Sequence, residues 1–174
     1  MIAFYFWFAT GFAAGVVVAS FFEWLQGLPF PTWIAESDSL WGFPFVLFLH
    51  SLGMGLSGGA AYIIALRLLG VGRPLLVSSL RVLFKIFWAG FFLNLVTGSI
   101  LFAAHATTTG YIPIYYAKLS LILVGMLLSV PIRRFVDGGA SDGTIPPLVK
   151  ALAFVSLVVW TGVITTGLLV AYLG

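Results

Sequence analysis

The sequence predicts an all-α integral membrane protein, a bundle of about five transmembrane helices forming a single domain over residues 1–174. Hydrophobic residues make up 61% of the 174 residues and charged residues only 7%, whereas a soluble domain carries about 25% charged residues. The mean hydropathy is +1.16. Several apolar stretches approach or exceed the roughly 20 residues that a helix needs to cross a bilayer, and the basic residues gather in two of the connections.

Segments that contain glycine, proline or polar residues interrupt the apolar stretches and set the bounds of the expected spans. The first stretch lacks a basic leader and a cleavage site, which favours a retained helix over a removed signal peptide. Residues 23–38 follow it and contain Pro29 and Pro31, which break a helix. Glycine and proline also interrupt residues 70–74 and 135–147. We expect spans at residues 2–22, 40–69, 82–104, 114–130 and 148–172.

Basic residues orient this bundle in the membrane. Most of the basic residues lie beside two connections. The first is flanked by Arg67, Arg73, Arg81 and Lys85, and the second by Arg133, Arg134 and Lys150. Lys and Arg are enriched on the cytoplasmic side of membrane proteins. We therefore expect a multi-pass protein of the bacterial inner membrane with its N-terminus in the cytoplasm. The net charge of +3 is small, and no nucleic-acid partner is expected.

The second span carries the strongest functional signal. It contains one histidine, His50, followed by a run of small residues, namely Gly53, Gly55, Ser57, Gly58 and Gly59. An ionisable side chain inside a membrane segment is costly, so it marks a functional site by default. Glycines let a neighbouring helix or a flat cofactor approach closely. Gly53 and Ser57 are therefore candidates for lining a cofactor site beside His50.

His105 follows the third span, and the two histidines are expected at similar heights. His50 lies 17 residues before Arg67 and His105 lies 20 residues after Lys85, which corresponds to about 26 Å and about 30 Å of helix. Two imidazoles at one depth could be the axial ligands of haem b or ligands of copper or zinc. Alternatively, His50 only hydrogen-bonds a neighbouring group and His105 is an interfacial residue.

Lys118, near the start of the fourth span, is open to two interpretations. Its ammonium could pair with a haem propionate or another anionic ligand, or it could extend along the helix to the lipid headgroups. The chain has no cysteine, which excludes disulfides and thiolate metal sites from it. No HExxH pair or phosphate loop is present either, so a hydrolase is not expected.

Two functions fit these residues. The first is a b-type cytochrome-like subunit that transfers electrons near the outer face, with the cofactor at His50 and His105. The second is an accessory subunit without a cofactor, which packs into a larger membrane complex or a homo-oligomer. Two GxxxG spacings, Gly11–Gly15 and Gly55–Gly59, favour the second because they permit close helix packing.

The chain also resembles a family of small, uncharacterised bacterial multi-span membrane proteins. The resemblance extends over most of residues 33–130 and rests on the runs SLWGFPFVLFLHSLGMGLSGG, ALRLLGVG, TGSILFAAHA and YYAKLSL. It implies a multi-span helical fold and no assigned activity. The family often has an acid where Leu47 and His105 stand here, so a site at His105 would be particular to this chain. The H-x-x-G element adds a weaker likeness to haem-binding and copper-handling bundles.

Overall fold

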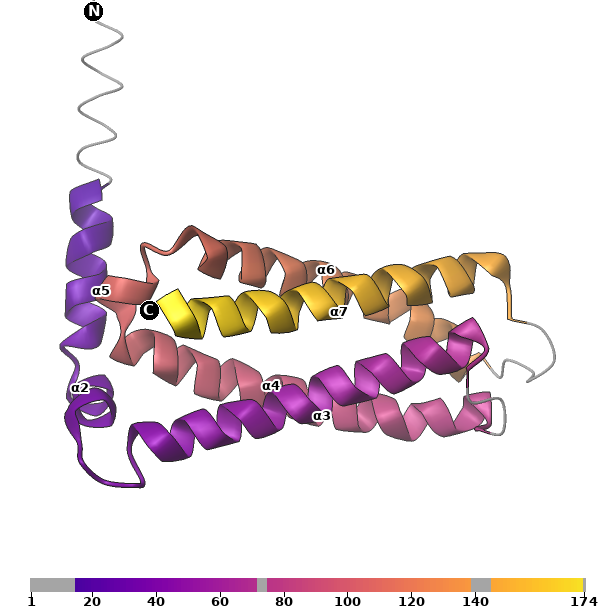
Figure 1. Ribbon diagram of the computed structural model, residues 1–174, viewed down its shortest axis with the longest axis horizontal. Helices are drawn as coiled ribbons and strands as arrows, with labels where there is room; N and C mark the ends of the chain where they lie inside the picture. The colour runs from indigo at the N-terminus through magenta and orange to yellow at the C-terminus, as the bar shows by residue number, and fades with distance from the viewer. Residues whose placement is uncertain (1–14, 72–74, 139–144, 174) are drawn as a thin grey trace, which may run out of the picture.

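The computed structural model describes residues 15–71, 75–138 and 145–173, and these residues form a helical bundle (Figure 1). Four long helices run antiparallel, namely α3 (Phe43–Leu69), α4 (Leu80–Ala104), α6 (Pro113–Asp137) and α7 (Pro147–Leu173). All four are long and apolar enough to cross a membrane. The predicted all-α membrane bundle is confirmed.

Three shorter helices gather at one end of this bundle, which we call the capped end. They are Gly15–Gln26, α2 (Pro29–Glu36) and α5 (Ala106–Thr109). Residues 15–22 of this helix are the described part of the expected first span, and the helix continues to Gln26, past the expected end. The remainder of that span lies outside the described residues. Figure 1 shows this helix running across the capped end rather than alongside the four long helices.

Aromatic packing and a glutamine hold the helix Gly15–Gln26 in this position. The buried ring of Phe22 meets Phe102 and Tyr111 edge to face, with ring centroids 5.8 and 5.6 Å apart. Gln26 Oε1 accepts hydrogen bonds from the backbone N–H and the hydroxyl of Thr107, at 3.0 and 2.7 Å. The glutamine thereby satisfies a backbone donor at the start of α5, which a helix leaves without an internal partner.

The opposite end, which we call the basic end, contains η1 (Val77–Ser79), the last turn of α6 and the first turn of α7. The largest apolar cluster lies in this half of the bundle and includes Ile64, Leu68, Leu80 and Phe84. Midway along the bundle, Phe87 of α4 packs edge to face on Trp160 of α7, with centroids 5.3 Å apart. A smaller third cluster lies at the capped end, so the core follows the bundle axis through most of its length.

The long helices are arranged as two hairpins joined through α3 and α7. α3 packs closely on α4, α6 packs on α7, and α3 also packs on α7, whereas the contact between α4 and α6 is looser. α3 and α6 therefore lie diagonally across the bundle. The seam between α4 and α6 is the more loosely packed side of the described structure, and Phe102 of α4 stacks there on Tyr115 of α6 with ring centroids 5.0 Å apart.

Two glycines bring α3 and α4 into backbone contact. A Cβ atom on Gly90 would lie 2.6 Å from Ser57 N and 2.8 Å from Gly53 O, closer than side-chain carbons approach other atoms. A Cβ on Gly53 would in turn lie 3.0 Å from Gly90 O. Small residues at a helix crossing permit this approach, so the α3–α4 hairpin has one well-defined register.

The orientation of the bundle can be tested by labelling, because the chain has no cysteine of its own. We expect a cysteine replacing Thr108 at the capped end to react with a membrane-impermeant maleimide in intact cells. A cysteine replacing Ser78 at the basic end should react only after the membrane is opened, because Lys and Arg favour the cytoplasmic side. Both positions are exposed, so accessibility from one side decides the result. The reverse labelling pattern would show that the bundle is inserted the other way round.

Candidate functional site

Polar side chains of three helices lie at one depth in the half of the bundle near the capped end. His50 is seven residues into α3 and Lys118 is five residues into α6, which places them about 10 Å and about 8 Å from those helix ends. Thr97 is seven residues before the end of α4, at about 10 Å by the same rise. We call this group, together with Asn94 and Ser57, the interior polar site.

His50 is oriented by a hydroxyl of α4. Its Nδ1 lies 3.0 Å from Thr97 Oγ1, and the Thr97 hydroxyl donates its own proton to the backbone carbonyl of Leu93, at 2.7 Å. A hydroxyl has one proton to donate, so Thr97 must accept from Nδ1–H of His50. In the neutral tautomer that satisfies this hydrogen bond, Nε2 carries the free lone pair.

Gly98 makes room for this ring. A Cβ on Gly98 would lie 3.1 Å from His50 Cε1, so a larger side chain would press on the imidazole. The sequence pattern Thr97-Gly98 therefore supplies an acceptor and a space for the same ring. Sequence analysis identified His50 but not Gly98, because only the helix register shows that the two residues face each other.

A second hydrogen-bonded chain runs beside the first. Ser57 Oγ donates to the carbonyl of Gly53 at 2.8 Å and accepts from Asn94 Nδ2 at 3.4 Å. The Asn94 Oδ1 atom is buried and has no hydrogen-bond partner among the described residues. Buried polar atoms are rarely left unpaired, so the interior polar site offers an unused acceptor. The predicted lining residues Gly53 and Ser57 thus lie at the α3–α4 contact, with Gly53 about one turn and Ser57 about two turns from His50 along α3.

Lys118 points into the bundle against α7. Its Nζ lies 3.5 Å from the position that a Cβ on Gly167 would take, and the sulfur of Met54 lies 3.9 Å from the same position. Met54 is four residues after His50 on α3. No carboxylate among the described residues forms an ion pair with Lys118.

His105 lies apart from the interior polar site. It ends α4, and its ring packs edge to face on Phe43 at the start of α3, with centroids 5.3 Å apart. His50 contacts Thr97, eight residues earlier on α4, or about 12 Å along the helix. The expectation of similar heights is therefore wrong. The count started from Lys85, but α4 begins at Leu80, whose side chain already clusters with Leu68 at the far end of α3.

This geometry separates the predicted pair of ligands. The two imidazoles differ in depth by about two helical turns and contact different residues. Within the described ranges, no group of three or more His, Asp or Glu side chains is arranged to hold a metal ion. Ligation of one haem, copper or zinc by both His50 and His105 stays a prediction, and the separation does not favour it.

Comparison with known proteins gives one family. The model of a family of unknown function, DUF6644, matches residues 21–173. No curated protein and no solved structure shows a significant match. The expected membership in an uncharacterised family agrees with this result, and the likeness to haem-binding and copper-handling bundles stays a prediction.

Proposed function

The chain belongs to this family of unknown function, and we propose that it is an electron-transfer subunit of the bacterial inner membrane in which His50 supplies a nitrogen ligand to haem b. The observation that carries the proposal is the hydrogen bond from His50 Nδ1 to Thr97 Oγ1. Histidines that bind a metal usually donate their other ring N–H to a protein acceptor, which fixes the ring and its tautomer. Thr97 provides that acceptor.

The surroundings of His50 also support an anionic cofactor. Lys118 places an ammonium group at the same depth, on the diagonal helix α6, without a carboxylate partner among the described residues. A cation in this position would be stabilised by a propionate or a similar anion. Haem b would supply one-electron iron chemistry, while His50 and Lys118 would bind and orient it.

The proposal assigns a single histidine ligand to each chain. His105 is about two turns away from His50 along the α3–α4 hairpin, and its ring packs on Phe43. Copper or zinc would use the same Nε2 atom but would need further donor side chains. The described residues do not gather such donors around His50, so haem b remains the preferred cofactor.

The test is the visible spectrum of protein purified from cells supplied with a haem precursor. We expect a reduced-minus-oxidised b-type spectrum that is lost in His50→Ala and retained in His105→Ala, because only His50 has a free ring nitrogen in the interior polar site. His105→Ala is the matched control, since it removes the other imidazole of the chain. A wild-type protein without a Soret band would contradict the proposal, and so would equal loss in both variants.

A specific observation favours the accessory-subunit function as a second candidate. Gly55 and Gly59 are exposed on α3, and a Cβ on either would meet no atom within 4 Å. They lie one turn apart on one face, a spacing that lets a second transmembrane helix approach closely. The partner would be another membrane subunit or a second copy of this chain. In the other predicted GxxxG pair, a Cβ on Gly15 would also meet no atom within 4 Å, and Gly11 lies outside the described residues.

Assembly can be tested by native electrophoresis after gentle solubilisation. Replacing Gly55 and Gly59 by Leu should shift the protein to a smaller species, because the added side chains would separate the helices at the contact. Ser120→Leu is the control, since Ser120 is a small exposed residue on the distant helix α6. A wild-type monomer that cross-linking in membranes does not change would argue against this second function.

A further inference from the structure

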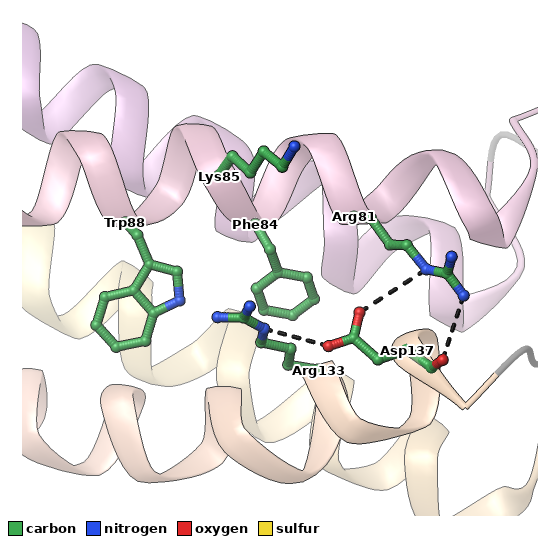
Figure 2. A pocket seen from close by; sticks show the side chains of 6 residues that line it. All are labelled: Arg81, Phe84, Lys85, Trp88, Arg133 and Asp137. Carbon is green, nitrogen blue, oxygen red and sulfur yellow. Dashed lines mark hydrogen bonds and ion pairs between the residues drawn. The ribbon is translucent and has the colours of Figure 1, made fainter.

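A cavity of about 460 Å³ opens at the basic end, on the seam between α4 and α6 (Figure 2). Its lining combines charged and aromatic side chains, namely Arg81, Phe84, Lys85, Trp88, Arg133 and Asp137. The volume falls within the range of small-molecule binding sites, about 300–1,000 Å³. Neither the interior polar site nor the glycine face of α3 contributes a residue to it.

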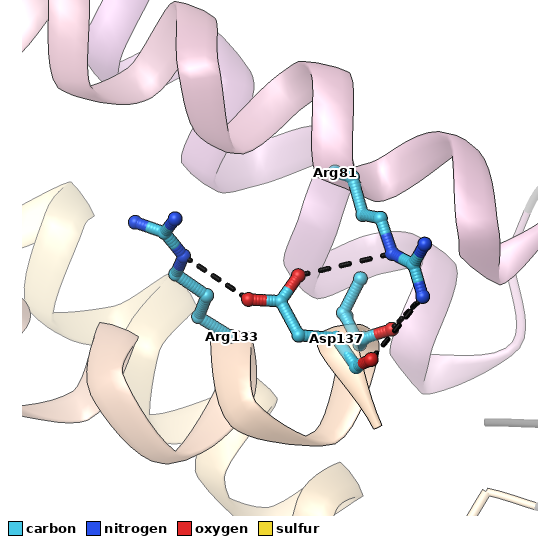
Figure 3. A network of polar contacts seen from close by, with 4 residues as sticks. Arg81, Arg133 and Asp137 are labelled. Atoms are coloured by element: carbon cyan, nitrogen blue, oxygen red, sulfur yellow. Dashed lines mark hydrogen bonds and ion pairs between the residues drawn. The ribbon is translucent and has the colours of Figure 1, made fainter. Parts of the chain in front are cut away.

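The charged part of the cavity is organised by one carboxylate. Asp137 lies between two guanidinium groups, with Oδ2 3.3 Å from Arg133 Nε and Oδ1 3.8 Å from Arg81 Nε (Figure 3). Arg81 Nη2 also donates to the backbone carbonyl of Asp137 at 3.2 Å. Arg81 thereby joins α4 to α6, whereas Arg133 pairs with Asp137 within α6. These contacts leave most N–H groups of both arginines available for other acceptors.

The lining residues carry an excess of positive charge. Arg81, Lys85 and Arg133 contribute three cations, and Asp137 contributes the single anion. Guanidinium groups bind phosphate through paired N–H donors. An anion such as a phosphate group would therefore complement the cavity better than a neutral or cationic ligand.

Trp88 supplies an independent sign of a missing ligand. Its Nε1 atom is buried and has no hydrogen-bond partner among the described residues. Figure 2 shows the Arg133 guanidinium between Asp137 and Trp88, with the indole nitrogen on the side of Arg133. Buried N–H groups are rarely left unpaired, and an oxygen of a ligand bound beside Arg133 would supply the missing acceptor.

The depth of the lining residues points to an amphiphilic ligand. Arg81 is the second residue of α4, and Trp88 lies seven residues after it, about 10 Å further along the helix. The cavity therefore has Arg81 near the membrane surface and Trp88 deepest in the bilayer, with Phe84 and Lys85 between them. Because the seam between α4 and α6 is the loosely packed side of the bundle, a lipid can enter it laterally.

We propose that the α4–α6 cavity binds an anionic phospholipid, with its phosphate held by Arg81, Lys85 and Arg133 and its chain against Phe84 and Trp88. Basic pockets between transmembrane helices on the cytoplasmic side are known to receive such headgroups. The bound lipid fills the cavity beside the Arg81–Asp137 ion pair, and it adds to the contacts that hold the two hairpins together.

The proposal is tested by titrating the detergent-solubilised protein with phosphatidylglycerol or phosphatidylcholine and measuring bound lipid by native mass spectrometry. We expect phosphatidylglycerol to bind about tenfold more tightly, because both lipids carry the phosphate but the choline cation of phosphatidylcholine would be repelled by the excess positive charge of the lining. Replacing Lys85 and Arg133 by Gln should remove this preference. Arg134→Gln, the same change at an exposed residue outside the cavity, should preserve it.

Two further measurements distinguish a bound lipid from other ligands of the cavity. Trp88→Phe keeps the aromatic wall and removes the N–H, so it should weaken phosphatidylglycerol binding about fivefold. Inorganic phosphate should neither displace the lipid nor raise the melting temperature as the lipid does. Equal binding of both lipids, an unchanged preference in the Lys85→Gln/Arg133→Gln variant, or full competition by inorganic phosphate would overturn the proposal.

Discussion

The backbone contact between Gly53 and Gly90 is the constraint on which the rest of this bundle depends. A Cβ on Gly90 would lie within 2.8 Å of atoms of α3, so the two helices meet in one register only. That register sets which polar residues face each other: Asn94 reaches Ser57, and Thr97 reaches His50. In a bilayer, where water does not compete for polar groups, these hydrogen bonds help to keep α3 and α4 together.

The two ends of the bundle have different chemistry as a result. Near the capped end, the polar groups of α3, α4 and α6 turn inward, and an imidazole and an ammonium group lie at the same depth between diagonal helices. At the basic end, Arg81, Lys85 and Arg133 lie on the looser α4–α6 seam and line a cavity (Figures 2 and 3). An electron carrier near one face and a structural lipid near the other would use these two ends separately, so losing one ligand need not remove the other.

The sequence predicts the helical class and the four long spans because apolar length and Lys/Arg position are local properties. It does not predict the path of Gly15–Gln26, since the contacts of Phe22 with Phe102 and Tyr111 join residues far apart in the chain. The height of His105 relative to His50 was predicted wrongly for a related reason. That height depends on where α4 begins, and the sequence does not show that α4 begins at Leu80. From the sequence alone, the cations of the basic end indicate only how the protein is oriented in the membrane. The cavity that some of them line depends on α4 and α6 lying side by side.

The most direct test of this account is the tautomer of His50, read from nitrogen chemical shifts of protein labelled with ¹⁵N-histidine in bilayers. The chain has two histidines, so His105→Ala assigns the remaining signals to His50. The account predicts that cofactor-free protein shows a protonated Nδ1, hydrogen-bonded to Thr97, and an unprotonated Nε2. A protonated Nε2, in either the neutral or the charged ring, would contradict it, because no lone pair would then be available to a ligand.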